Sequence, residues 1–172
     1  MKYFYAFYLI ICFVSCKAKS NLTPEKTGDV TTILCPEDGV CTFEILENSA
    51  LKNKIDHLGS IYPEIVPGNT LVAKFEYKKN NDINLQDSSY REELYIELDK
   101  SNPEIETENL KNENLFFARW CYCKGQTGFY KINKGKLKVV KISEKDYQIN
   151  LSFIIDEVPQ IINKINYNFS LQ

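Results

Sequence analysis

Apolar and polar side chains alternate with a period of two along much of this chain. The carboxy-terminal segment is the clearest case, with Ile165, Tyr167, Phe169 and Leu171 separated by Asn and Ser. The same alternation occurs over residues 71–78, 93–98 and 147–155 and, more weakly, over 42–46, 51–57 and 136–142. This period is typical of half-buried β-strands, and no segment of ten or more residues has a helical period. The chain is therefore predicted to be all-β.

The segment 115–123 differs from the others because it carries large apolar groups on both faces, which predicts a central strand covered on both sides. The segment 132–137 contains Gly135, which can adopt a positive φ, and is predicted to be a hairpin turn. We therefore expect the last 45 or so residues to form a four-stranded antiparallel meander. The whole is predicted to be an antiparallel β-sandwich or partly open barrel, with a lipocalin-like closed barrel as the alternative.

Turn-forming residues are expected to separate the strands at Pro63, at Pro67-Gly68, at 80–82 and at 101–103. No repeat or low-complexity tract interrupts residues 31–172, which are predicted to form one β-rich domain. A domain of this size can bury roughly two thirds of its unfolded surface, which is enough for a single core.

The amino terminus has the layout of an export signal. Met1-Lys2 is followed by an uncharged apolar run over residues 3–14, and the small residue Ser15 follows it. This run is too short for a membrane-spanning helix, which needs about 20 apolar residues.

The residues Phe13-Val14-Ser15-Cys16 resemble the lipobox of bacterial lipoproteins. The resemblance implies that residues 1–15 are a signal peptide, that Cys16 is acylated, and that membrane lipid is thereby a partner of the chain. Residues 16–30 are rich in Lys, Ser, Asn and Thr and are predicted to be a flexible tether. The alternative is a secreted protein cleaved elsewhere, for example after Ala18. Residues 35–46, 119–132 and 158–165 are similar in style to small β-rich lipoproteins of Bacteroidota, a resemblance that implies the anchor and the β-rich fold but no particular reaction.

The expected location is therefore the cell envelope. No acidic residue stands in Lys17-Ala18-Lys19-Ser20, which favours an outer-membrane anchor facing the periplasm over display at the cell surface. The formal net charge of the chain is −2, without a basic stripe, so nucleic acid is not an expected partner.

Four cysteines remain after Cys12 and Cys16, namely Cys35, Cys41, Cys121 and Cys123. An exported chain is expected to form disulfides, and four cysteines allow three pairings. The Pro-Glu-Asp-Gly turn between Cys35 and Cys41 favours a local bond there. On a regular strand the Cα atoms of Cys121 and Cys123 would be about 6.6 Å apart, at the upper edge of bridging distance, so their pairing stays open. The alternative for this pair, next to Lys124, is thiol redox or metal chemistry.

Little else in the sequence indicates chemistry. His57 is the only histidine, so a hydrolase has the least support, and no metal or cofactor is expected. Three aromatic residues of the central strand are candidates for a small apolar pocket: Phe116, Trp120 and Tyr122. The expected function is that of a non-catalytic binding or interaction module, whose partner is an envelope protein or a small apolar ligand.

Overall fold

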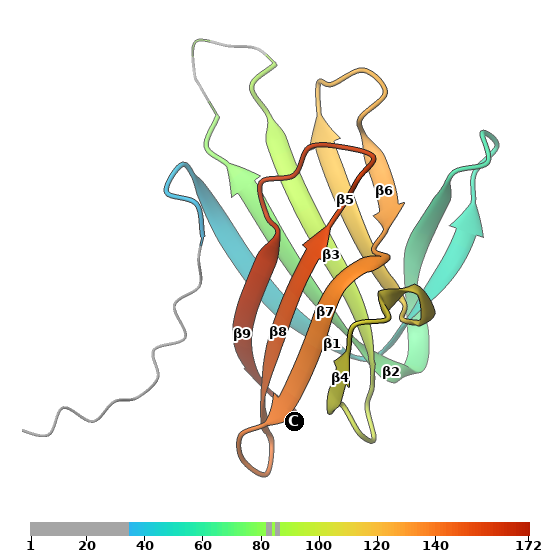
Figure 1. The fold of residues 1–172 in the computed structure, drawn as a ribbon, viewed down its shortest axis with the longest axis vertical. Coiled ribbons are helices and arrows are strands. Elements are labelled where there is room, and N and C mark those ends of the chain that lie inside the picture. The colour runs from blue at the N-terminus through green and yellow to red at the C-terminus, as the bar shows by residue number, and fades with distance from the viewer. Residues whose placement is uncertain (1–34, 82–83, 85–86) are drawn as a thin grey trace, which may run out of the picture. The chain divides into compact units, whose positions relative to one another are not determined.

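The computed structural model describes residues 35–81, 84 and 87–172, and these residues form two antiparallel sheets (Figure 1). The first sheet has the strand order β1 (Gly39–Ile55), β2 (Ile61–Lys79), β3 (Tyr90–Asp99), β5 (Leu115–Cys121) and β6 (Gly128–Lys131). The second has the order β4 (Ile105–Thr107), β7 (Lys134–Lys141), β8 (Asp146–Ile154) and β9 (Lys164–Ser170). A 3₁₀ turn, η1 (Leu110–Asn112), precedes β5. No helix in this part of the chain has the length and apolarity needed to cross a membrane.

The inner faces of the two sheets pack against each other to form the main core. The rings of Phe75 and Tyr167 lie 5.7 Å apart between centroids, and those of Phe117 and Phe153 lie 5.9 Å apart. Each pair joins one sheet to the other, because the apolar face of every strand is turned inward. The all-β prediction is confirmed, and the arrangement is that of a β-sandwich. The lipocalin-like alternative is wrong, since the two sheets share no strand pairing among the described residues.

The carboxy-terminal meander differs from the expected one in its fourth strand. β7, β8 and β9 pair consecutively, but their fourth partner is β4, whereas β6 pairs with β5 in the other sheet. The chain changes sheets at Ile132, which is fully buried and whose N–H donates to the carbonyl of Leu115 at 3.1 Å. The predicted hairpin turn at 132–137 is therefore wrong. Gly135 does have a positive φ, of 140°, but inside β7, where a Cβ would lie 2.0 Å from the carbonyl oxygen of Ser152.

β1 and β2 form one long hairpin that continues through the predicted breaks. The weakly predicted segments 42–46 and 51–57 join into β1, which ends at Ile55, two residues short of the second segment, and has a bulge between Glu47 and Ser49. Pro63 and Pro67 lie inside β2, opposite Asn53 and Ser49. These prolines are tolerated because β3 pairs only with residues 70–78 of β2, so on that side their missing N–H groups deprive no strand of a bond.

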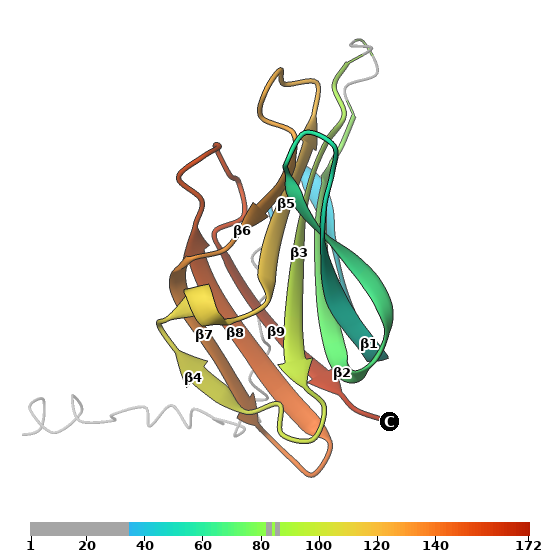
Figure 2. The same cartoon turned by 90° about the vertical axis from the view of Figure 1, so that its right-hand side faces the viewer.

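The distal half of this hairpin, residues 49–67, covers the outer face of the first sheet (Figure 2). Leu51 packs with Val72, Tyr95, Phe116 and Ala118 in a second, smaller cluster of buried residues, which we call the outer cluster. The Tyr62 ring also reaches Phe129 of β6, at 6.4 Å between centroids. The outer cluster explains why both faces of β5 are apolar, and the prediction of a central strand covered on both sides is confirmed for residues 115–118.

The Glu97 carboxylate holds the bend of the hairpin in place. It accepts hydrogen bonds from the Thr70 hydroxyl at 2.7 Å and from the Asn114 amide at 2.5 Å. The same two side chains also contact the backbone of β1, because the single Thr70 hydroxyl hydrogen is shared with the carbonyl of Ser49, at 2.7 Å, and the Asn114 amide donates its other hydrogen to the carbonyl of Leu51. The distal half is thereby tied to β3 and to the start of β5.

Candidate binding site at the loop end

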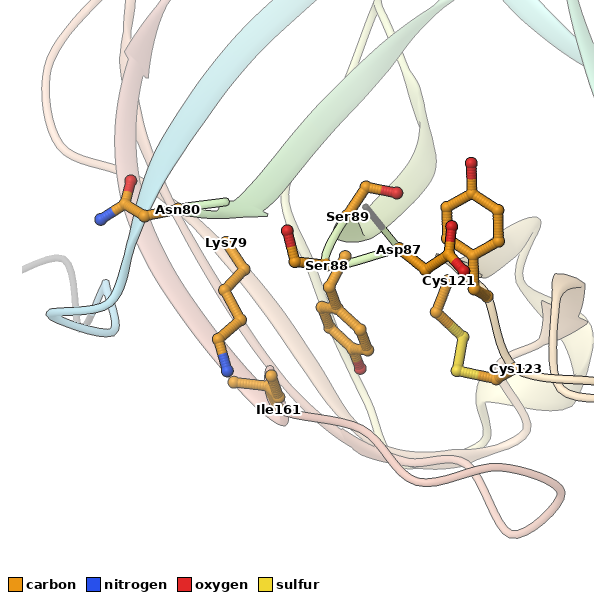
Figure 3. A pocket seen from close by; sticks show the side chains of 10 residues that line it. Lys79, Asn80, Asp87, Ser88, Ser89, Cys121, Cys123 and Ile161 are labelled. Carbon is orange, nitrogen blue, oxygen red and sulfur yellow. A yellow bond between two sulfur atoms is a disulfide. The ribbon is translucent and has the colours of Figure 1, made fainter. Parts of the chain in front are cut away.

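Three sets of connecting residues lie at one end of the sandwich, drawn at the top of Figure 1: residues 80–81 and 87–89 between β2 and β3, residues 122–127, and residues 155–163. They surround a pocket of about 490 Å³. Its lining consists of Lys79, Asn80, Asp87, Ser88, Ser89, Tyr90, Cys121, Tyr122, Cys123 and Ile161. Lys79 and Ile161 lie on one side of it, and the two cysteines lie on the other (Figure 3). Tyr122 is 71% exposed and Ile161 is 42% exposed, so the pocket is open and presents apolar groups to solvent.

A buried polar network lies beneath the pocket. Glu92 of β3 and Arg119 of β5 are directly opposite each other in the strand register, and both side chains are buried. The Tyr90 hydroxyl connects them, because it donates to Glu92 Oε1 and accepts from Arg119 Nε at 3.2 Å. Arg119 also lies over the Tyr90 ring and donates to the side chain of Gln126 at 2.9 Å. The connection formed by residues 122–127 is therefore joined to this network.

Glu92 fixes the part of the pocket formed by residues 155–163. Its two carboxylate oxygens accept the backbone N–H groups of Ile161 and Ile162, each at 2.7 Å. Burial raises the pKa of Glu92, and the hydrogen bonds from Tyr90 and the two backbone groups oppose that rise. Burial also raises the pKa of Tyr90, to about 12. The segment that carries Ile161 is thus held against β3, and the pocket is formed before any ligand arrives.

Glu92 and Arg119 were not singled out in the sequence, although a signal for them exists. Leu94, Ile96 and Leu98 alternate on the inward face of β3, and Glu92 belongs to the same alternating set. Arg119 likewise follows Leu115 and Phe117 on β5. A charged residue at an inward position of a strand needs a partner, so two such residues predict a buried network.

The four cysteines form two disulfides, Cys35–Cys41 and Cys121–Cys123. The first is the bond expected from the turn between its cysteines, and it packs against the main core. The second spans Cα atoms 5.2 Å apart, less than the strand value, because β5 ends at Cys121 and the chain bends at the next residue. This second disulfide forms part of the pocket wall.

The three candidate pocket aromatics are not gathered at one site. Phe116 is 1% exposed and belongs to the outer cluster. Trp120 donates to Glu93 at 2.6 Å and lines a neighbouring hollow with Arg91, whereas Tyr122 lines the loop-end pocket. His57 is exposed at the turn between β1 and β2 and is not among the residues that line this pocket. Cys16, the signal peptide and the tether lie outside the described residues.

Within the described ranges, no group of three or more His, Cys, Asp and Glu side chains is placed to hold a metal ion. No family model, no curated protein and no solved structure matches the chain. What the fold and the site define is a class: an antiparallel two-sheet sandwich with a preformed pocket among the loops at one end.

Proposed function

We propose that this chain is a lipid-anchored envelope protein whose loop-end pocket binds a segment of another envelope protein. The observation that carries the proposal is the pocket wall itself, in which exposed Tyr122 lies between the disulfide-bonded Cys121 and Cys123 and exposed Ile161 is held by the buried Glu92 carboxylate. An exposed aromatic group on a rigid support, surrounded by polar residues, has the composition of a protein interface centre. Five of the lining residues are exposed, and a site this open would bury too little of a small apolar ligand.

The anchor is proposed from the sequence motif at Cys16. Several acyl chains, each contributing about 0.8 kcal/mol per buried CH₂, hold a protein at a bilayer where a single chain does not. We place the domain on the periplasmic side of the outer membrane. Replacement of Cys16 by Ala is expected to release the protein from the membrane fraction. Mass spectrometry of the wild-type amino-terminal peptide should show acylation at Cys16, and an unmodified start beyond it would contradict the anchor.

The pocket can be tested by site-specific photo-crosslinking in cells. A photoreactive amino acid at Tyr122 is expected to give a discrete protein adduct, and the same group at Ile142, 55% exposed in the β7–β8 connection, serves as the control. The adduct should weaken at least several-fold when the rim residue Asp87 is replaced by Lys. Equal labelling from the two positions would contradict a site at the loop end. An apolar molecule that copurifies with the protein and is lost with Tyr122→Ser would replace the protein partner by a small ligand.

A second candidate function is thiol–disulfide exchange at Cys121–Cys123, favoured by the position of both sulfurs in the wall of an open pocket. A thiolate of a partner protein would attack one sulfur and displace the other as a thiolate, giving a mixed disulfide. A second thiol of the partner would then resolve it, so that the partner dithiol is oxidised and Cys121 and Cys123 are reduced. Metal handling by the same pair would require this reduced form.

Cys35–Cys41 is an internal control for the exchange reaction, because it packs against the core instead of lining the pocket. In thiol buffers of stepped potential, followed by alkylation and mass spectrometry, Cys121 and Cys123 are expected to become labelled under milder conditions than Cys35 and Cys41. Equal resistance of the two bonds in the folded protein would contradict a redox role.

A further inference from the structure

The turn that joins β1 to β2 carries an exposed apolar tip. Ile55, Leu58 and Ile61 are 71%, 79% and 51% exposed, although all three are large aliphatic residues. Ile55 and Ile61 are directly opposite in the last pair of the ladder, so their side chains lie on the same face. Leu58 projects from the turn between them. We call these three residues the hairpin tip. Single exposed apolar residues are common on protein surfaces, whereas a cluster at the end of a projecting hairpin marks an interaction site.

The backbone of this turn is suited to an apolar environment. The Asp56 carboxylate accepts the N–H groups of Leu58 and Ser60, each at 2.8 Å. The backbone N–H groups of Asp56 and Gly59 bond to carbonyls within the same turn. Four backbone donors are therefore satisfied inside the turn and would lose no partner on leaving water. These hydrogen bonds also lower the pKa of Asp56, so its carboxylate stays ionised and limits how deeply the tip can enter.

We propose that the hairpin tip inserts into the interface of the lipid bilayer, as a second membrane contact beside the acyl group at Cys16. The proposal rests on the proposed anchor, because the chain from Cys16 to Cys35, at about 3.4 Å per residue, would keep the domain within about 60 Å of the membrane. At that range the contact has a high effective concentration. Electrostatic attraction to the membrane surface contributes little, since the positive charges of Lys52 and Lys54 near the tip are offset by the negative charges of Asp56 and Glu64.

The shape of the tip favours lipid over a protein partner. The tip is convex and ends a projecting hairpin, so a protein would need a matching cavity, whereas a bilayer deforms around it. Figures 1 and 2 draw the tip toward the same end of the domain as the loops 122–127 and 155–163. Insertion would therefore turn the loop-end pocket toward the membrane surface, where a membrane-proximal partner segment would meet it.

The test uses the full chain, purified from membranes and reconstituted in vesicles of phosphatidylethanolamine and phosphatidylglycerol whose acyl chains carry bromine. A single tryptophan reporter is made by L58W combined with W120F. A matched reporter is I142W combined with W120F, at an exposed residue of the β7–β8 connection. We expect bromine to quench the L58W emission at least about twofold more than the I142W emission. Far-UV circular dichroism checks that both variants are folded.

Equal quenching of the two reporters in acylated, vesicle-bound protein would overturn the tip proposal while leaving the anchor intact. A lack of acylation, seen in the mass of the amino-terminal peptide, would instead remove the anchor on which the proposal rests. If the L58W reporter is unquenched in vesicles but becomes shielded when a second envelope protein is added, the tip is a protein contact and the lipid assignment is wrong. Substitution of Ser for all three tip residues should abolish membrane protection of the turn from added protease.

Discussion

Phe116 and Phe117 are neighbours on β5, and both are fully buried, yet they belong to different parts of the molecule. Phe117 faces the main core, where the second sheet covers it and Phe153 lies against its ring. Phe116 faces the outer cluster, which the distal half of the β1–β2 hairpin covers. The two side chains are therefore equally buried but are covered by different elements. The inner face depends on a whole sheet, and the outer face depends on a bent hairpin that ends in an exposed tip.

The largest loss of stability is expected when a side chain of the main core is removed. Phe117→Ala removes a ring that contacts both sheets and leaves a cavity that neither sheet can close without repacking. We expect a loss of about 3–5 kcal/mol in the free energy of unfolding. Urea denaturation followed by circular dichroism measures it, and an intact two-state transition with a loss below 1 kcal/mol would contradict the central role of this face.

Removing a side chain of the outer cluster should lower the free energy of unfolding by less, and it should loosen only the distal half of the hairpin. Phe116→Ala is expected to cost about 2–3 kcal/mol, because the hairpin can move into the space that the ring leaves. Hydrogen exchange should accelerate in residues 49–67 and remain unchanged in β8. Leu51→Ala removes a facing side chain of the same cluster and should give the same pattern. If exchange rises equally in both regions, the hairpin and the sandwich unfold as one unit.

A smaller effect tests the polar tie at the bend. Glu97→Gln keeps the shape of the side chain but removes the charge that accepts from Thr70 and Asn114. We expect a loss of about 1 kcal/mol, since hydrogen bonds to charged groups are the stronger ones. Exchange in residues 49–67 should rise as it does in Phe116→Ala. Thr70→Val, which removes one donor, is the matched variant and should show a weaker form of the same change.

The smallest effects concern two carboxylates with opposite pKa shifts. Burial beneath the pocket raises the pKa of Glu92, so the folded state holds its proton more tightly than the unfolded chain does. The Glu92 contribution to stability is then complete below the ordinary pKa of 4.5 and falls as the pH rises through the folded value. Glu106, exposed on β4 beside Lys136 and Lys138, has its pKa lowered to about 2. Its contribution is present above 4.5 and is lost as the pH falls toward 2.

The two contributions can be separated by urea midpoints measured between pH 2 and 8. Glu92→Gln should remove the decline of stability on the neutral side of pH 4.5, whereas Glu106→Gln should remove only the decline on the acid side. A pH profile of Glu92→Gln that parallels the wild type would show that this buried carboxylate does not titrate differently on folding.

The strands themselves were largely predictable, because alternation is a local property. The segments 71–78, 93–98, 147–155 and 165–171 all lie in strands, within a residue or so at their ends. The breaks predicted at Pro63 and Pro67 were wrong, because β2 continues through both residues. Whether a proline interrupts a strand depends on whether a neighbour needs its N–H, and β3 stops short of both positions. The residues of the loop-end pocket were found only in part, since Tyr122 and the cysteines were candidates but Ile161 was not. Glu92 and Arg119, which lie beneath the pocket, were also missed.

The sequence by itself determined the all-β class and the inward face of the clearly alternating segments, since both follow from side chains one or two positions apart. It also indicated the local Cys35–Cys41 pairing from the turn that separates the two cysteines. Only the tertiary structure decided that β6 leaves the carboxy-terminal meander for the first sheet, that the hairpin folds over Phe116, and that Glu92 meets the segment containing Ile161. These outcomes depend on contacts between residues far apart in the chain. A local sequence pattern does not tell which of the alternative long-range contacts is the more stable.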